Sequence, residues 1–169
     1  MLLVGGASTR FGSPKALVQI DGETLAERAW RLLGDACDER IAVGKHADRL
    51  ELPFDVLDDG TDVRAPIAGV VAGLRAAQND VAVVIPVDVP RLTREALYEL
   101  ADACRDVATP PSGPLPGAYR QTALPALERA LAEGRLALRA AIIGLGVATV
   151  ELDVSLLFNV NTPDDVRRL

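Results

Sequence analysis

Short apolar runs separated by amphipathic stretches alternate along the whole chain. The runs lie at 2–4, 16–20, 40–43, 54–57, 81–85 and 147–152, with the length and composition of buried strands. The run at 81–85 is apolar at every position, which is typical of a parallel strand covered by helices on both faces. The alternation of strands with helices predicts an α/β fold with a mainly parallel sheet.

Capping signals and turn residues predict where the helices begin and end. Thr24 and Glu27 have the spacing of a capping box, and Gly34 is predicted to end the helix that follows. Further helices are predicted over 65–78 behind Pro66, after Thr93, over 124–138 with a break at Gly134, and after Thr162. The proline-rich stretch at 108–119 is predicted to be a loop, too short to link two domains.

Length and composition narrow the class of protein. The 169 residues contain no internal repeat and suit one domain, 1–169. A net charge of -6 argues against nucleic-acid binding, but a few local cations can still bind a small anion. No run reaches the length of a membrane span, and no secretory signal is evident. Cys37 and Cys104 have no metal-site spacing, so we expect two reduced thiols in a cytoplasmic protein.

The segment VGGASTRFGSPKAL, residues 4–17, has the features of an anion-binding loop. Its glycines allow a ligand close to the backbone N–H groups, and Arg10 and Lys15 add positive charge. In α/β folds, ligands bind at the carboxyl ends of the strands, where this loop begins. The segment matches neither the Walker A pattern nor G-x-G-x-x-G. From the glycines alone, a surface turn with two solvated cations is an equally good interpretation.

Carboxylates follow two of the predicted strands. Asp88 lies just after the apolar strand at 81–85, at the sheet edge where the glycine loop is expected. Mg²⁺ prefers one or two carboxylates together with phosphate oxygens, so Asp88 is a candidate metal ligand, although a turn-forming aspartate is the alternative. Asp58 and Asp59 follow another strand, and either could face a ligand or lie in a solvated turn.

Four segments, taken in order, resemble a known family. They are LVGGASTRFGSPKAL, LDD followed by APIAGVVAGL, IPVDVPRL, and FNVNTPDDV. Together they span nearly the whole chain and resemble the molybdenum cofactor guanylyltransferases of the nucleotidyltransferase superfamily. The resemblance implies a three-layer α/β/α, Rossmann-like nucleotidyltransferase fold.

The resemblance also implies a role for each matching residue. The nucleotide would be held through the backbone of Leu3, Gly5 and Gly6, and its triphosphate would be neutralised by Arg10 and Lys15. Asp59 would fix the nucleoside, and Gly69 would allow close packing. Asp88 would hold Mg²⁺, and the acceptor phosphate would lie near Asn159 and Asn161. Arg10, Lys15 and Asp88 would be the catalytic residues.

The implied reaction transfers GMP from GTP to the terminal phosphate of molybdopterin and releases pyrophosphate, with Mg²⁺ as cofactor. GTP and molybdopterin would be the binding partners, with transient contact to other molybdenum cofactor proteins. Because a phosphate acceptor is already largely ionised at neutral pH, no strong general base is required. We therefore expect His46, the single histidine, to be a surface residue.

Two departures from the family pattern bear on the choice of substrate. Gly44 stands roughly where an asparagine is often found, and the region that usually covers the acceptor is compressed into 108–120. A related nucleotidyltransferase that uses CTP or a different phosphate acceptor is therefore an alternative. A non-catalytic nucleotide-binding protein is a third hypothesis, against which the presence of Lys15 and Asp88 argues.

Overall fold

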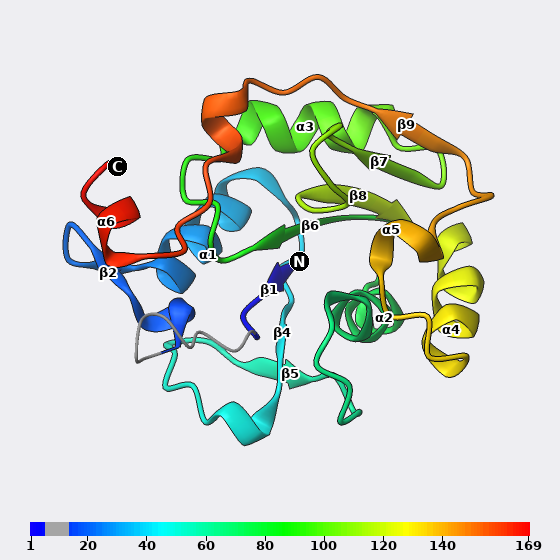
Figure 1. Ribbon diagram of the computed structural model, residues 1–169, viewed down its shortest axis with the longest axis horizontal. Coiled ribbons are helices and arrows are strands. Elements are labelled where there is room, and N and C mark those ends of the chain that lie inside the picture. The colour runs from blue at the N-terminus through cyan, green and yellow to red at the C-terminus, as the bar shows by residue number, and fades with distance from the viewer. Residues whose placement is uncertain (6–13) are drawn as a thin grey trace.

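The computed structural model describes residues 1–5 and 14–169 and contains one seven-stranded sheet in the order β5-β4-β1-β6-β8-β7-β9 (Figure 1). Its strands are β1 (Leu2–Leu3), β4 (Ala42–Gly44), β5 (Val56–Asp58), β6 (Val81–Pro86), β7 (Val107–Thr109), β8 (Gly117–Arg120) and β9 (Val147–Thr149). A separate pair joins β2 (Gln19–Ile20) to β3 (Glu23–Thr24). The helices are α1 (Leu25–Ala36), α2 (Pro66–Ala76), α3 (Arg94–Ala103), α4 (Leu124–Ala132), α5 (Leu138–Ala141) and α6 (Pro163–Val166).

The sheet is mainly parallel, as the sequence predicts. Strand β1 pairs in parallel with β4 and β6, β4 pairs in parallel with β5, and β7 pairs in parallel with β9. Strand β8 alone is antiparallel to its two neighbours, β6 and β7. The central position of β1 between β4 and β6 makes it the point where the strand order reverses.

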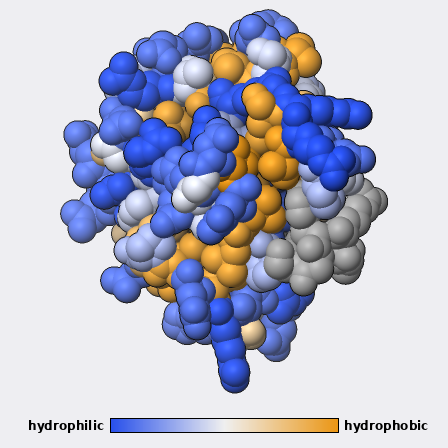
Figure 2. Space-filling view, turned by 90° about the vertical axis from the view of Figure 1, so that its left-hand side faces the viewer, coloured by the Kyte–Doolittle hydropathy of each residue, from blue (hydrophilic) through white to orange (hydrophobic). Residues whose placement is uncertain are grey.

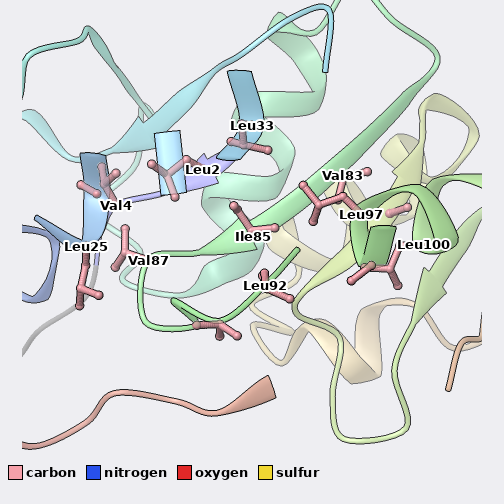
Figure 3. Close-up of a cluster of buried hydrophobic side chains, with 14 of the residues drawn as sticks. Leu2, Val4, Leu25, Leu33, Val83, Ile85, Val87, Leu92, Leu97 and Leu100 are labelled. Atoms are coloured by element: carbon pink, nitrogen blue, oxygen red, sulfur yellow. The ribbon is translucent and has the colours of Figure 1, made fainter. Parts of the chain in front are cut away.

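Helices cover both faces of the sheet, which confirms the three-layer α/β/α arrangement (Figure 1). One core contains side chains from α1, α3 and one face of the central strands, including Leu2, Leu33, Ile85 and Leu97 (Figure 3). The other core packs α2, α4 and α5 against the opposite face. Since burial of each large apolar side chain contributes about 1.5–3 kcal/mol, these two cores are the main stabilising contribution.

Helix α1 begins as predicted but ends later. Thr24 and Glu27 form both hydrogen bonds of the capping box. The prediction that Gly34 ends the helix is wrong, because the helix continues to Ala36. A Cβ on residue 34 would lie 2.7 Å from Nη1 of Arg40. Gly34 therefore leaves room for the guanidinium of Arg40, which also lies over the ring of Trp30.

The prediction of a loop over 108–119 is wrong at both ends. Strand β7 extends to Thr109 and strand β8 begins at Gly117, so the prolines are confined to the connection between them. Tyr119 is fully buried, and its hydroxyl donates a hydrogen bond to the carbonyl oxygen of Pro114, at 2.7 Å. The two short strands are stable because pairing with β6 and β9 satisfies their backbone groups, and local sequence carries no signal for such pairing.

Other predicted bounds shift by a few residues. The run 16–20 divides into the 3₁₀ turn η1 (Lys15–Leu17) and β2, and the predicted helix over 124–138 breaks at Gly134, whose φ is +72°.

Cys104 is buried and Cys37 is half-buried, and both are free thiols. Within the described part of the chain, no helix is long and apolar enough to cross a membrane. The face at the left of Figure 1 is largely hydrophilic, with a hydrophobic band between the charged side chains (Figure 2).

Candidate functional site

A cavity of about 320 Å³ opens at the carboxyl ends of the central strands. Its walls come from the residues that end or follow β1, β4, β5 and β6, together with the start of α2. The position follows from the topology, because β5, β4, β1 and β6 are mutually parallel, so their carboxyl ends lie at one edge of the sheet, where ligands bind in such folds. Leu3, Gly5, Lys15, Asp59, Gly69 and Asp88, all named from the sequence as site residues, line this cavity.

Lys15 joins three distant parts of the chain at the β6 side of the cavity. Its Nζ donates to Oδ2 of Asp88 at 2.9 Å and to Oδ1 of Asn161 at 2.6 Å. The Lys15 and Asp88 side chains are each only 22% exposed. This geometry excludes the interpretation of Lys15 as a freely solvated cation on a surface turn.

Asn161 is fixed in place by the segment around it. The backbone N–H of Asn161 donates to Oδ2 of Asp165 at 3.0 Å, and the adjacent Val160 N–H donates to the carbonyl oxygen of Asp88 at 2.8 Å. Asp165 also accepts from Thr162 in the capping box of α6. These hydrogen bonds hold the pKa of the Asp165 carboxyl below its usual value.

Of the other predicted site residues, one lies away from the cavity and two lie outside the described part of the chain. The Asn159 side chain is exposed, donates to the carbonyl oxygen of Leu157 at 3.1 Å, and does not line the cavity. Gly6 and Arg10 lie outside the described residues. The structure therefore brings Asn161 to Lys15 and Asp88, but it does not bring Asn159 to them.

At the β5 side of the cavity, Asp59 forms a buried ion pair with Lys45. The Lys45 Nζ lies 2.7 and 2.9 Å from the two carboxylate oxygens, and the side chains are 11% and 7% exposed. The neighbouring Asp58 accepts instead from the backbone N–H groups of His46 and Gly60, which lower the pKa of its carboxyl. Asp59 is thus the carboxylate that lines the cavity, while Asp58 stabilises the turn.

Sequence reasoning missed Lys45 and the pair formed by Arg64 and Asp48, at 2.8 Å, all of which line the cavity. Lys45 follows the C-terminal end of β4, so the argument applied to Asp88 could also have found it. His46 is exposed, as predicted, with 75% of its side chain accessible. Among the described residues, the ionisable groups of the wall are three cations and three carboxylates, and each cation is paired with one carboxylate.

The oxygen atoms around Lys15 fit a magnesium ion better than a transition metal. A carboxylate oxygen of Asp88 and an amide oxygen of Asn161 both point to one position, now occupied by an ammonium group. Among the described residues, no group of three or more histidine, cysteine or acidic side chains could enclose a metal. Mg²⁺ is commonly held by one or two protein oxygens plus phosphate oxygens and water, and this donor set matches that habit.

The glycines of the cavity leave room for neighbouring side chains. A Cβ on Gly69 would lie 2.9 Å from Cδ2 of Leu3, and a Cβ on Gly44 would lie 2.8 Å from Cγ2 of Val4. Without a Cβ at these positions, α2 packs against the Leu3 side chain of β1, and β4 packs against the Val4 side chain. The roles that the resemblance assigns to Leu3, Gly5 and Gly69 remain predictions, since geometry alone tests none of them.

A three-layer α/β fold with a cavity at the carboxyl ends of its parallel strands is a common setting for nucleotide binding, and comparison with known proteins specifies the class. The family model described as "MobA-like NTP transferase domain" matches residues 1–146. The chain belongs to this family and is a nucleotidyltransferase. The resemblance noted in the sequence is thereby confirmed.

Individual relatives agree with this assignment. The chain is 32% identical to a probable molybdenum cofactor guanylyltransferase from Chloroflexus aggregans, over 99% of this chain and 90% of that protein. It is 28% identical to a molybdenum cofactor guanylyltransferase from Desulfosudis oleivorans, over 99% of this chain and 92% of that protein. The crystal structure of molybdopterin-guanine dinucleotide biosynthesis protein A from Archaeoglobus fulgidus superposes with a TM-score of 0.80 at 27% identity, covering 99% and 94% of the chains.

Proposed function

We propose that this chain transfers GMP from GTP to the terminal phosphate of molybdopterin. The observation that carries the proposal is the convergence of Lys15, Asp88 and Asn161 at the edge of the cavity. The choice of guanine and of molybdopterin is supported by the two molybdenum cofactor guanylyltransferases that match nearly the whole chain.

In the proposed reaction, an oxygen of the molybdopterin phosphate attacks the α-phosphorus of GTP. A new P–O bond forms as the bond to the β-phosphate oxygen breaks, and pyrophosphate leaves. The attacking phosphate is largely ionised at neutral pH, so no protein group needs to remove a proton. Catalysis then depends on positioning and on neutralisation of charge, as in other phosphoryl transfers.

Charge balance supports a role for additional cations. The described ionisable side chains of the wall cancel one another, whereas GTP brings about four negative charges. Lys15 would be available to the phosphates if Asp88 and Asn161 held another cation in its place. Asp88 and Asn161 would hold Mg²⁺, which would supply charge neutralisation and a template for the phosphates. Arg10, in the predicted glycine loop, is the remaining cation assigned to the triphosphate.

The test is a transfer assay with purified protein, molybdopterin, Mg²⁺ and each of GTP, CTP, ATP and UTP. Of the four nucleotides, only GTP is expected to release pyrophosphate and to give a molybdopterin–guanine dinucleotide, which is identified by its mass. Product formation from CTP would replace guanylyl transfer by cytidylyl transfer. Nucleotide binding without transfer to molybdopterin would contradict the acceptor, and sugar phosphates and polyol phosphates would then be tested.

The metal requirement is tested in the same assay. Removal of Mg²⁺ with EDTA is expected to abolish transfer, and readdition is expected to restore it. The Asp88→Asn variant should need a higher Mg²⁺ concentration for half-maximal rate than the wild-type protein, because it offers the metal a neutral oxygen in place of a carboxylate. Equal Mg²⁺ dependence in the two proteins would exclude Asp88 as a metal ligand.

A further inference from the structure

The Lys45–Asp59 ion pair lines the cavity although its two side chains are only 11% and 7% exposed. A buried ion pair contributes little to stability on balance, since the cost of removing two charges from water offsets their attraction. Stability alone therefore does not account for the pair, and its place in the wall suits contact with a ligand.

The hydrogen bonds of Asp59 leave one acceptor position open. Its Oδ1 accepts from Lys45 and from the backbone N–H of Thr61, at 2.7 and 3.2 Å. Its Oδ2 accepts from Lys45 at 2.9 Å. Each carboxylate oxygen can accept two hydrogen bonds, so among the described residues Oδ2 has one unused lone pair. Lys45 is anchored in turn by the carbonyl oxygen of Thr61.

The pair lies at the end of the cavity away from the phosphate-binding groups. Asp59 follows β5 and Asp88 follows β6, and these strands are separated by three steps across the sheet. At about 4.8 Å per step, the two carboxylates belong to strands about 14 Å apart. A nucleotide whose phosphates lie against Lys15 extends across the strand ends and brings its base toward Lys45 and Asp59.

We infer that Lys45 is a positioning residue that makes the Asp59 carboxylate selective for guanine over adenine. This inference rests on the proposed function, and it extends to Lys45 the contact that the resemblance assigns to Asp59 alone. Lys45 fixes the direction of the carboxylate and cancels its charge, which would otherwise repel the triphosphate.

The edge of guanine complements the Asp59 carboxylate. Guanine carries an N–H donor at position 1, which can donate to the open acceptor position of Asp59 Oδ2. The three N–H groups of the Lys45 ammonium are already directed to Asp59 and Thr61, so Lys45 orients the carboxylate without contacting the base. Adenine in the same place presents a lone pair at position 1 to Asp59, and a site built for a hydrogen bond strongly rejects a ligand that leaves it unpaired.

The test compares dissociation constants of GTP, ITP and ATP, measured by calorimetry, in the wild-type protein, Lys45→Met and Lys45→Arg. The wild-type protein is expected to prefer GTP over ATP, and ITP, which keeps the groups at positions 1 and 6, should follow GTP. In Lys45→Met the preference for GTP over ATP should fall by about 10- to 100-fold, the range for losing a hydrogen bond to a charged group. Lys45→Arg keeps the charge and should recover part of the preference.

Arg31→Met is the matched control. It removes the cation of another ion pair, with Glu23 at 2.9 Å, which does not line the cavity. This variant should keep the wild-type preference. If Lys45→Met fails to fold, as judged by thermal unfolding, the double variant Lys45→Met/Asp59→Asn leaves no unpaired buried charge and should show the same loss.

The outcomes separate this inference from the proposed function. A wild-type protein that binds GTP and ATP equally, or a folded Lys45 variant with unchanged preference, would refute the inference even if transfer to molybdopterin occurs. Lys45-dependent selectivity for GTP without any transfer would support the inference and contradict the proposed acceptor. A preference for ATP would overturn the assigned pairing of base and ion pair.

Discussion

Replacement of Lys15 by methionine separates the chemical role of its charge from its contribution to folding. Methionine has a similar length and retains most of the apolar contacts of the lysine stem. It removes the ammonium that lies 2.9 Å from Asp88 and 2.6 Å from Asn161. We expect a large loss of transfer activity together with a small change in stability.

The effect on stability follows from the geometry of the pair. Two unit charges at 2.9 Å attract by about 1.4 kcal/mol in bulk water and by about 6 kcal/mol at an effective dielectric constant of 20. Desolvation and the ordering of both side chains offset most of this, and pairs with access to water contribute about 1 kcal/mol or less. For a chain of this size, the melting temperature should fall by about 2–4 °C at most.

The effect on catalysis should be several times larger in free energy. The positive charge of Lys15 acts on phosphate charge that develops in a partly enclosed cavity. Loss of a single preorganised donor of this kind lowers rates by about 10²–10³, or about 2.7–4 kcal/mol. The assay is the initial rate of pyrophosphate release with saturating GTP and molybdopterin, beside a thermal unfolding curve of the same preparation.

The control is Arg31→Met, whose ion pair with Glu23 is exposed and away from the cavity. That variant should keep the wild-type rate. The reasoning is refuted if Lys15→Met is folded and its rate lies within about threefold of the wild-type rate. A rate loss accompanied by a much larger drop in melting temperature would show instead that Lys15 is mainly structural.

Two further predictions concern the walls of the site. Gly69→Val should lower the free energy of unfolding by about 1–3 kcal/mol and weaken GTP binding, because the new Cβ would lie 2.9 Å from Leu3 Cδ2. Denaturant unfolding measures the stability, and calorimetry measures the binding. A variant as stable as the wild-type protein would contradict this packing argument. Hydrogen bonds from Asn161 and Thr162 lower the pKa of the Asp165 carboxyl in the folded protein. The contribution of this carboxyl to the free energy of unfolding is therefore present above its unfolded pKa and is lost as the pH falls through its lower folded pKa. The Asn161 amide resonance should therefore shift on acid titration below about pH 3.9, and an unchanged resonance in that range, or the same shift in Asp165→Asn, would contradict the assignment.

The sequence by itself determined the class of fold and part of the site. The apolar run at 81–85 required a strand buried on both faces, and such strands occur where helices cover both sides of a parallel sheet. The capping box at Thr24 fixed the start of α1, because its hydrogen bonds are local. Asp88 could be placed at the ligand edge, since any residue directly after a parallel strand lies at the same edge of the sheet.

Only the tertiary structure decided which polar groups meet. Lys15 and Asn161 are 146 residues apart, and no local pattern brings them within hydrogen-bond distance. Asp58 and Asp59 are indistinguishable in sequence, yet successive side chains of an extended segment point to opposite sides, so one lines the cavity and its neighbour caps a turn.

The same distinction explains the errors. Strands β7 and β8 were missed because their stability comes from pairing with β6 and β9, while the prolines between them dominated the local pattern. Glycine usually breaks a helix, which predicts a helix end at Gly34, whereas α1 continues to Ala36 and Gly34 leaves room for the side chain of Arg40, just beyond the helix end. Local hydrogen bonds and hydrophobic periodicity are encoded within a few residues, but close contacts across the fold exist only once the sheet has formed.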